Sequence, residues 1–310
     1  MPKPTEHHNL SQELKQKVSI VHAGLINKGN TCYANTILQA LTVLPRLWSQ
    51  LPSESSLSSP LVKSIVLNMS LLNRSRSPID PSNFLGALQN RMHALNNNAF
   101  YHNHQQDVPE ILQVVFDEII GSSPLVDNLL SVTVTTTTSC NSCCFSTSRE
   151  QKDSILILPT CKSIADFFNK FLQPQELLGD NKWFCPQCSS QEATIETQIF
   201  NCGDFLVVQL LRYTSVNGSS FKDNKLVNCL PKRHHVLKVA SHPTDDVSFN
   251  NKYNLVATIN HSGTLKAGHY WAFIKDQQNT WFKCNDRCIS QVDTFHLNNS
   301  SSYILFFSRN

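Results

Sequence analysis

Cys32 lies between a turn-forming segment and an apolar segment, which is where a reactive thiol would be placed. Residues 24–31 are rich in Gly and Asn, and the residues after Cys32 repeat apolar side chains at helical spacing. A thiol at a helix N-terminus meets the positive end of the backbone dipole, which favours the thiolate, the nucleophile of cysteine chemistry. Alone, however, a cysteine before a helix is more often a small buried apolar residue.

A nucleophilic thiol needs a base, a group that orients the base and donors for the oxyanion. The best base candidate is His269, which follows Gly268 and opens a predicted strand. Asn285 and Asp286 come 16 and 17 positions later, and either can accept a hydrogen bond from an imidazole. A strand, a tight turn and a returning strand would bring 269 and 285 together. A single His beside Gly is usually structural, so the assignment of His269 as a base depends on the combination of motifs.

Four cysteines form two C-x-x-C pairs, Cys140 with Cys143 and Cys185 with Cys188. Four thiolates match the tetrahedral coordination of a structural Zn²⁺, with no position left for a substrate water. Four free thiols are the alternative, and a redox pair is less favoured because two pairs are present. Cys144 makes the first pair ambiguous, although the C-x-x-C spacing favours Cys143. We therefore expect one structural zinc and neither a catalytic metal nor an organic cofactor.

The length and composition fit one large domain or two fused layers. The chain has 310 residues, 40% of them hydrophobic, and a net charge of 26 − 23 = +3. Without a long basic block or an apolar run of about 20 residues, neither nucleic acid nor a membrane is an expected partner. Residues 1–21 form a polar lead-in without the features of a signal peptide, and the 11 cysteines are an odd number. These features favour a reducing compartment, cytoplasmic or nuclear.

The hydrophobic pattern predicts a helical first part and a β-rich second part, an α+β arrangement. Helices are expected at 32–44 (capped by Asn30 or Thr31 and ended by Pro45), 61–72, 82–95 (capped by Ser82) and 108–120. Strands are expected at 131–138, 204–213, 253–259, 270–274 and 303–307. Loops and connections are expected at 49–60, 73–82, 214–224 and 241–251.

Taken together, these segments resemble the ubiquitin-specific proteases, a family of cysteine deubiquitinases. Residues 24–41 resemble the Cys box of that family, and residues 253–286 resemble its His box. Residues 105–112 resemble its Gln box, and residues 206–213 resemble the palm strand that ends in Arg-Tyr or Arg-Phe. The matches follow the family order from about residue 22 to residue 307, which is nearly the whole chain.

The resemblance implies a papain-like α+β fold with a helical thumb, an antiparallel β palm and zinc-tipped β fingers. After the lead-in at 1–21, a single catalytic domain would cover residues 22–310. Within it the thumb would span about 22–125, the fingers about 126–205 and the palm about 206–310. The four-cysteine zinc site would lie at the tip of the fingers.

The resemblance also assigns roles to the candidate catalytic residues. Cys32 becomes the nucleophile, His269 the general base and Asn285 the group that orients it. Asn27, with the backbone N–H of Cys32, would donate hydrogen bonds to the oxyanion. Asp286 becomes a neighbouring acid that supports the site, or an alternative third member of the triad.

For the substrate, the resemblance implies a narrow channel for the Gly-Gly tail of ubiquitin. It places Asp107, together with Glu110, near the arginines of that tail, and Gly268 and Tyr270 along the channel. Pro109 departs from the usual residue before the glutamate. Without the resemblance, these two acids would be read as a solvated helix face.

The expected reaction is hydrolysis after the C-terminal glycine of ubiquitin, with ubiquitin and ubiquitinated proteins as partners of a monomeric enzyme. A protease for another ubiquitin-like modifier is a rival, because its tail channel would be nearly identical. An inactive ubiquitin-binding module is a second rival. It is disfavoured because Cys32, His269 and Asn285 are all present.

Overall fold

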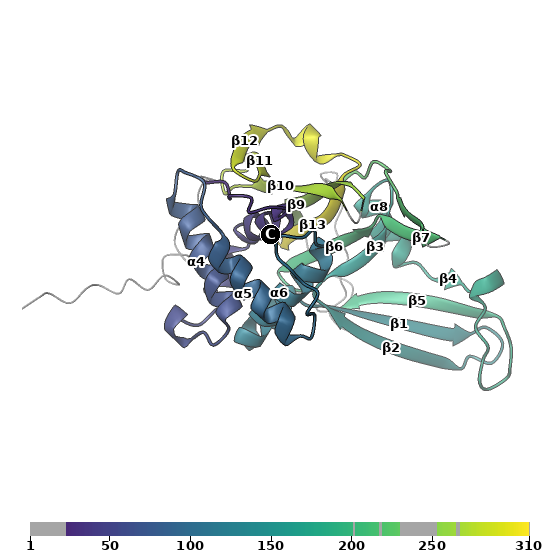
Figure 1. Cartoon of the computed structure of the whole chain (residues 1–310). Helices are drawn as coiled ribbons and strands as arrows, with labels where there is room; N and C mark the ends of the chain where they lie inside the picture. Colours follow the sequence, from purple (N-terminus) through teal and green to yellow (C-terminus); the bar gives the residue numbers. More distant parts are fainter. Residues whose placement is uncertain (1–22, 201, 217–218, 230–252, 265–266, 310) are drawn as a thin grey trace, which may run out of the picture.

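The computed structural model describes residues 23–200, 202–216, 219–229, 253–264 and 267–309. The predicted lead-in at 1–21 and the predicted connection at 241–251 lie outside the described residues. A helical thumb packs on a central sheet, the palm, and a second sheet, the fingers, extends away from both (Figure 1). None of the helices in these ranges combines the length and the hydrophobicity that a membrane span needs.

The thumb is a group of helices around one fully buried helix. Its helices are α2 (Cys32–Leu41), α3 (Pro45–Ser49), α4 (Pro60–Arg74), α5 (Ser82–Ala94), α6 (Val108–Ser122) and α7 (Pro124–Leu130), with a 3₁₀ turn at Glu54–Ser56. Every residue of α2 is buried. The outer helices are amphipathic, and α4 buries Leu61, Ile65, Met69 and Leu72 at helical spacing. The predicted helices at 61–72, 82–95 and 108–120 are thus confirmed within one to two residues.

The first predicted helix ends earlier than expected. Helix α2 stops at Leu41, and the chain turns before Pro45 begins α3. Proline disfavours the helical conformation of the residue before it, and Leu44 has φ −111° and ψ 60°. The predicted side-chain cap is also wrong, because the Thr31 hydroxyl accepts the backbone N–H of Lys28 (2.9 Å) and none of the α2 amides.

Two further local predictions need correction. Ser82 is the first residue of α5 and not its cap; the N-cap position is Pro81, and the Ser82 hydroxyl donates to Asp80. The connection predicted at 214–224 contains most of a short hairpin, formed by β7 (Tyr213–Val216) and β8 (Ser219–Lys222). Both errors come from polar sequences, whose hydroxyl and amide groups suit several local structures.

The palm is a seven-stranded sheet in the order β12-β11-β10-β9-β13-β6-β3. Its strands are β3 (Leu156–Pro159), β6 (Phe205–Leu211), β9 (Tyr253–Gly263), β10 (Gly268–Lys275), β11 (Trp281–Asn285), β12 (Cys288–Val292) and β13 (Ser302–Arg309). Its described neighbours pair antiparallel except β3 with β6, which are parallel. The segment predicted as fingers therefore contributes β3 to the palm.

The palm separates two apolar clusters. On one face, α2 and the other thumb helices pack against Ala257, Ile259, Ala272 and Ile274. On the other face, the second cluster contains side chains of the short helix α8 (Ile164–Phe171) and of the palm strands. A 3₁₀ turn at Thr294–Leu297 leads into β13. This three-layer packing fixes α2 against the strand that carries His269.

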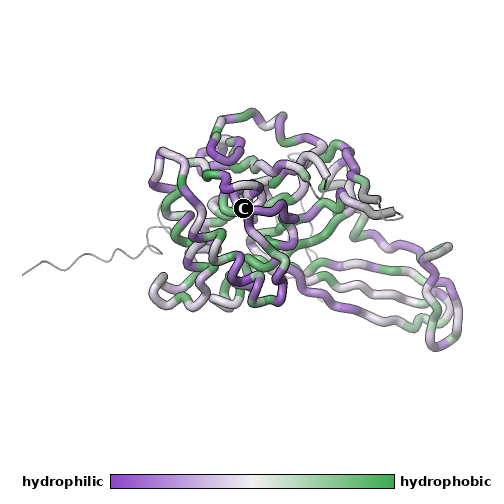
Figure 2. Tube along the Cα trace, in the orientation of Figure 1, coloured by the Kyte–Doolittle hydropathy of each residue, from purple (hydrophilic) through white to green (hydrophobic). Residues whose placement is uncertain are grey.

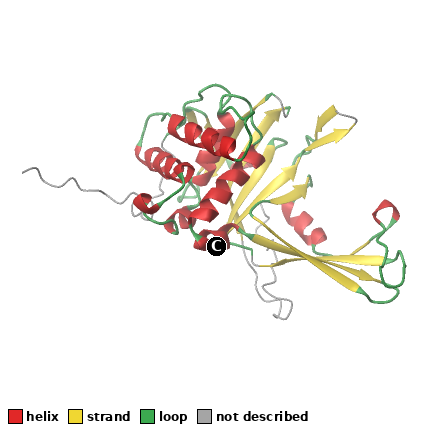
Figure 3. Cartoon of the chain, turned by 60° about the horizontal axis from the view of Figure 1, so that its bottom comes forward, coloured by secondary structure: helices red, strands yellow, loops and turns green. Residues whose placement is uncertain are grey.

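The fingers are a four-stranded antiparallel sheet in the order β2-β1-β5-β4. Figure 3 shows these strands extending away from the helices of the thumb. The strands are β1 (Val132–Cys140), β2 (Ser146–Asp153), β4 (Gln175–Glu176) and β5 (Ala193–Phe200), with a 3₁₀ turn at Gly179–Asn181. The outer strand β2 is polar and almost wholly exposed, and Figure 2 shows its hydrophilic character. Charged side chains on such an edge protect it from pairing with other chains.

Gly24 is the point where the thumb touches the turn between β11 and β12. A side chain at this position would place Cβ 2.3 Å from the carbonyl oxygen of Arg287 and 2.5 Å from that of Asp286. The adjacent Leu25 N–H donates to the Asp286 carbonyl (2.8 Å), and Ile79 bridges the same segment from the other side. Only glycine permits this backbone approach.

Gly24→Ala is expected to lower the melting temperature and to reduce the reactivity of Cys32, because the turn that carries Asp286 must move away. The matched control is Gly86→Ala in α5, where an added Cβ meets no atom within 4 Å. That control should stabilise the protein by about 0.5–1 kcal/mol, the usual gain for Gly to Ala inside a helix. Thermal unfolding and alkylation of Cys32 measure both effects. Equal melting temperatures for the two variants would contradict the close approach at Gly24.

Candidate active site

His269, on β10, faces Asn285, the last residue of β11. Its Nε2–H donates to the Asn285 side-chain oxygen over 2.6 Å, which leaves Nδ1 for the Cys32 thiol. The hydrogen bond with Cys32, followed by the one with Asn285, raises the pKa of His269 to about 9 against the opposing effect of burial. The structure thus brings together the three residues that the sequence singled out, and it favours a cationic imidazole beside the sulfur.

Cys32 is the first residue of α2, and it follows a turn of unusual backbone conformation. Gly29 (φ 95°) and Asn30 (φ 53°) lie in the left-handed region, which lets the chain reverse directly before the helix. The Cys32 side chain is only 2% exposed, and it lies at the positive end of a ten-residue helix. The predicted position of the thiol at a helix N-terminus is confirmed.

The hydrogen-bond partner of the His269 ring is Asn285 and not Asp286. The Asp286 carboxylate instead binds side chains of the thumb. Its two carboxylate oxygens accept from the side-chain amides of Asn35 (2.7 Å) and Asn27 (2.9 Å). Asp286 has φ 49° in the two-residue turn between β11 and β12, where Asn285 pairs with Cys288. This left-handed turn directs the carboxylate back toward α2.

The Asn27 amide is fixed on both sides. Its oxygen accepts the backbone N–H groups of Gly29 (3.0 Å) and Thr31 (3.2 Å), and its nitrogen donates to Asp286. An amide nitrogen carries two hydrogens, so one donor is left after the bond to Asp286. The oxyanion role of Asn27 stays a prediction, and its geometry is consistent with that role.

Of the predicted tail-binding residues, Tyr270 is buried, Asp107 is half-buried, and Glu110 and Gly268 are exposed. Asp107, at the N-cap of α6, accepts hydrogen bonds from the hydroxyls of Tyr270 (3.2 Å) and Tyr303 (3.1 Å). Burial raises the pKa of Asp107, and the nearby Glu110 charge adds to this effect. Pro109 lies in the first turn of α6, where it needs no backbone N–H partner.

Sequence reasoning missed three residues of this region, namely Asn35, Tyr303 and His261. Asn35 supports Asp286, and Tyr303 supports Asp107. His261 is 1% exposed and shares a hydrogen bond with Tyr213. Burial, and then the Lys222 and His269 charges, lower its pKa to about 4, so this imidazole is neutral. His261 lies in the predicted His box and Tyr303 in a predicted strand. Their positions in the sequence do not indicate which side chains they contact.

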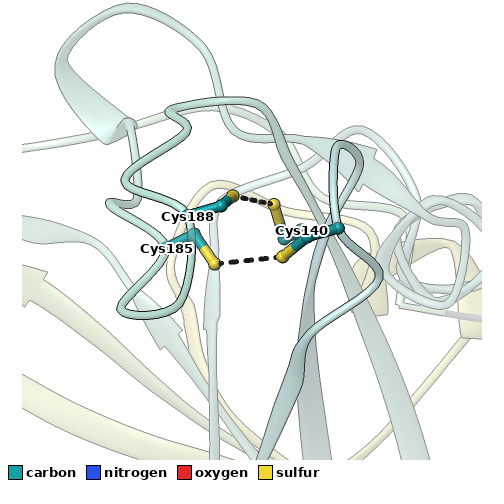
Figure 4. Close-up of side chains that lie close together, drawn as sticks. Cys140, Cys185 and Cys188 are labelled. Atoms are coloured by element: carbon teal, nitrogen blue, oxygen red, sulfur yellow. Dashed lines mark hydrogen bonds between the residues drawn. The ribbon is translucent and has the colours of Figure 1, made fainter.

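The four predicted cysteine ligands come together at the end of the fingers (Figure 4). All four sulfur atoms lie within 4.8 Å of one another, and the pairs Cys140–Cys188 and Cys143–Cys185 are 3.6 Å apart. Tetrahedral zinc with bonds of about 2.3 Å would place its sulfurs about 3.8 Å apart. This group of four thiols therefore has the size and the donor set that such an ion needs.

The two cysteine pairs also have the same backbone geometry. The residue after each pair, Cys144 or Ser189, has φ near 60° and donates its N–H to the carbonyl of the first cysteine of its pair. Cys140 and Cys185 each donate in turn to a carbonyl beyond that residue. Cys144 is exposed and occupies this turn position, which supports Cys143 as the fourth member of the cluster.

The fold is papain-like, and the site places a thiol, an imidazole and an amide in the order that thiol hydrolases use. The family model "Ubiquitin carboxyl-terminal hydrolase" matches residues 23–307, so the chain belongs to this family. Ubiquitin carboxyl-terminal hydrolase 51 of Mus musculus is 26% identical, over 92% of this chain and 51% of the relative. Ubiquitin carboxyl-terminal hydrolase 27 of Mus musculus is 24% identical, over 98% of this chain and 82% of the relative. The chain thus spans about half the length of the first relative.

Solved structures agree on the fold. The SAGA Ubp8/Sgf11/Sus1/Sgf73 DUB module bound to ubiquitin aldehyde matches with a TM-score of 0.72 and 23% identity, over 96% of this chain and 72% of the other. The same module bound to monoubiquitin matches with a TM-score of 0.74 and 22% identity, with the same coverage. The predicted α+β fold is thereby confirmed.

The raised pKa of His269 predicts how reactivity depends on pH. Folding raises this pKa from 6.5 to about 9, so the charged imidazole stabilises the fold fully below pH 6.5, and this contribution is lost as pH rises through about 9. The excess of the Cys32 alkylation rate over that of an ordinary thiol should disappear over the same upper range, because ordinary thiols also ionise there. Asn285→Ala removes a bond that favours the charged ring and should make this excess disappear at lower pH, whereas Asn90→Ala, at an exposed position of α5, should not. An unchanged profile in Asn285→Ala would refute this assignment.

Proposed function

We propose that this protein is a cysteine-type deubiquitinase that hydrolyses isopeptide or peptide bonds after the C-terminal glycine of ubiquitin. The observation that carries the proposal is the contact of His269 with both Cys32 and Asn285, at the N-terminus of a buried helix. Membership of the ubiquitin carboxyl-terminal hydrolase family supports the substrate class.

In the proposed reaction, the Cys32 thiolate attacks the carbonyl carbon of the terminal glycine, while His269 holds the proton. The carbonyl oxygen becomes an oxyanion, which the Asn27 amide and the Cys32 backbone N–H stabilise. Collapse of this intermediate expels the amine, which takes its proton from His269, and leaves a thioester on Cys32. Because Asp286 fixes the Asn27 amide before substrate arrives, this donor needs little reorganisation.

Water then hydrolyses the thioester. The neutral His269 accepts one proton from the attacking water, and the C–S bond breaks to release the glycine carboxyl group, which loses the second proton of that water to solvent. The thiolate–imidazolium pair is thereby restored. Asn285 keeps the ring oriented in both steps, since it binds the nitrogen that does not face the sulfur. No metal takes part in these steps.

Asp107 is our candidate for binding an arginine of the ubiquitin tail. A carboxylate has about four acceptor positions, and the two tyrosine hydroxyls take one on each oxygen. A guanidinium could use the others, and its charge would favour the ionised carboxylate that burial now disfavours. The exposed Glu110 would add negative charge at the entrance.

We further propose that Cys140, Cys143, Cys185 and Cys188 hold one structural Zn²⁺. The sulfur spacing and the matched backbone turns of the two pairs support this identity. The ion would join the β1–β2 connection to the segment before β5, which are otherwise linked by few side-chain contacts, such as Ser142 with Ser190 (2.8 Å). In this role the metal holds the fingers in shape.

Cys32→Ala is expected to abolish release of a fluorophore from the C-terminus of ubiquitin while ubiquitin binding is retained, because the nucleophile is lost and the surface is not. Fluorescence and binding titrations measure the two properties. Cys288→Ala, at an exposed cysteine of the β12 start, is the matched control and should keep full turnover. Turnover by Cys32→Ala would end the proposal.

Electrophilic probes built on ubiquitin and on related modifiers with Gly-Gly tails separate the remaining alternatives. A deubiquitinase should react with the ubiquitin probe through Cys32. Reaction only with another modifier would make the protein a protease for that modifier. Binding of ubiquitin without any covalent adduct would indicate an inactive binding module.

The metal site predicts about one zinc per chain, from the four thiolates that it offers. Cys143→Ser should lose the metal and lower the melting temperature, because one ligand is gone. Cys144→Ser alters the neighbouring exposed thiol, and this variant should retain the metal and the wild-type melting temperature. Metal analysis of purified protein and thermal unfolding with and without a strong chelator are the measurements. Zinc-free wild-type protein of unchanged stability would refute the site.

A further inference from the structure

His261 is a buried imidazole that takes no direct part in the proposed reaction. It is 1% exposed, and its Nε2 finds no hydrogen-bond partner among the described residues. A buried polar nitrogen without a partner costs free energy, so its retention calls for an explanation.

The imidazole lies directly over the residue that precedes His269. A Cβ on Gly268 would be 2.2 Å from Nε2 of His261, so the ring fills the space that a side chain would take. The His261 ring also packs on Tyr270, with ring centroids 4.2 Å apart. His261 therefore contacts the residues on both sides of His269.

This part of β10 has less backbone support than the rest of the strand. Residues 268–271 pair with β9, in the register Gly268 with Gly263 and Tyr270 with His261, whereas described pairing with β11 begins only at Ala272. A two-stranded extension is held weakly by its own backbone bonds. Side-chain packing across its face therefore adds to the Asn285 hydrogen bond in fixing the direction of His269.

Tyr213 fixes the orientation of His261. Its hydroxyl shares a hydrogen bond with Nδ1 of His261, and its ring lies 5.8 Å from the imidazole between centroids. The backbone of His261 is held as well, since its N–H donates to Ser301 (2.8 Å) and its carbonyl accepts from the Lys222 ammonium. The ring thus has one orientation, with Nε2 toward Gly268.

We propose that His261, oriented by the Tyr213 hydroxyl, is a positioning residue that fixes the β10 segment carrying His269 toward Cys32 and Asn285. It does not touch the reacting atoms, and it acts through Gly268 and Tyr270. The inference rests on the proposed function only for the identity of the substrate, since the contact between Cys32 and His269 is a property of the free protein.

Charged and titratable groups near His261 influence the pH profile of Cys32 alkylation. Lys222 and His269 carry positive charge near the ring. The rings of three tyrosines also pack around it, and the hydroxyls of two of them bind Asp107. The tyrosines are Tyr213, Tyr270 and Tyr303. A second positive charge here would oppose the cationic form of His269, so a neutral ring suits this position.

The test compares Tyr213→Phe, His261→Gln and their double variant with Tyr253→Phe. Tyr253→Phe is the matched control, because its buried hydroxyl donates to the Gly203 carbonyl on the distal part of the palm. Two readouts are used: kcat and KM for ubiquitin with a C-terminal fluorophore, and the pH profile of Cys32 alkylation by iodoacetamide without ubiquitin. Mass spectrometry of the Cys32 peptide separates this thiol from the exposed ones.

Tyr213→Phe should lower kcat about fivefold, the effect of one ordinary hydrogen bond. His261→Gln should lower it about ten- to a hundredfold, as for a misplaced catalytic group, with KM within about twofold of wild type. Both should alter the pH profile of Cys32 alkylation. The double variant should be no worse than His261→Gln, because the two residues act through one contact. Tyr253→Phe should lower the melting temperature and change neither readout.

An unchanged alkylation profile in folded Tyr213→Phe, additive effects in the double variant, or an equal loss of kcat in Tyr253→Phe would overturn the proposal. If His261→Gln does not fold, the Tyr213→Phe profile decides alone. If wild-type protein does not cleave ubiquitin but the alkylation profile moves as stated, the positioning role stands and the proposed substrate fails.

Discussion

The site depends on one residue of the β11–β12 turn, Asp286, which joins the palm to the thumb. Its carbonyl accepts the N–H of Leu25, and its carboxylate binds the amides of Asn27 and Asn35. These partners lie about 250 residues before it, on the turn and the helix that carry the candidate nucleophile. The bare backbone of Gly24 allows the two segments to approach. A single turn thereby sets the position of the segment before Cys32 relative to the strand next to His269.

Surroundings, and not residue type, separate the two histidines of the β9–β10 hairpin. His269 meets a thiol and an amide oxygen, and its pKa rises to about 9. His261 is buried beside a lysine and a tyrosine, and its pKa falls to about 4. Near neutral pH one ring is therefore charged and the other is neutral. The charged His269 ring can hold a thiolate. The neutral His261 ring can pack against the strand that carries His269 without strong charge repulsion between the two imidazoles.

Much of the fold could be predicted because the elements are long and regular. The buried strand at Phe205–Leu211 and the helix at Val108–Ser122 follow their apolar patterns closely. The early end of α2 at Leu41 and the β7–β8 hairpin could not be predicted, since packing and hydrogen bonds outweigh weak local preferences there. The parallel pairing of β3 with β6 joins segments about 50 residues apart, and four residues of β3 carry no sign of their partner.

Residue types and their order along the chain are enough to name the candidate catalytic and metal-binding residues. Few side chains serve as nucleophile, base or zinc ligand, so Cys32, His269, Asn285 and the two C-x-x-C pairs stand out by type and order. How these residues are held could be seen only in the folded chain. Asn35 and Tyr303 are common residues whose importance comes from partners 251 and 196 positions away, Asp286 and Asp107. Such contacts exist only once the thumb has packed on the palm, because hydrogen bonds act over about 3 Å whatever the separation along the chain.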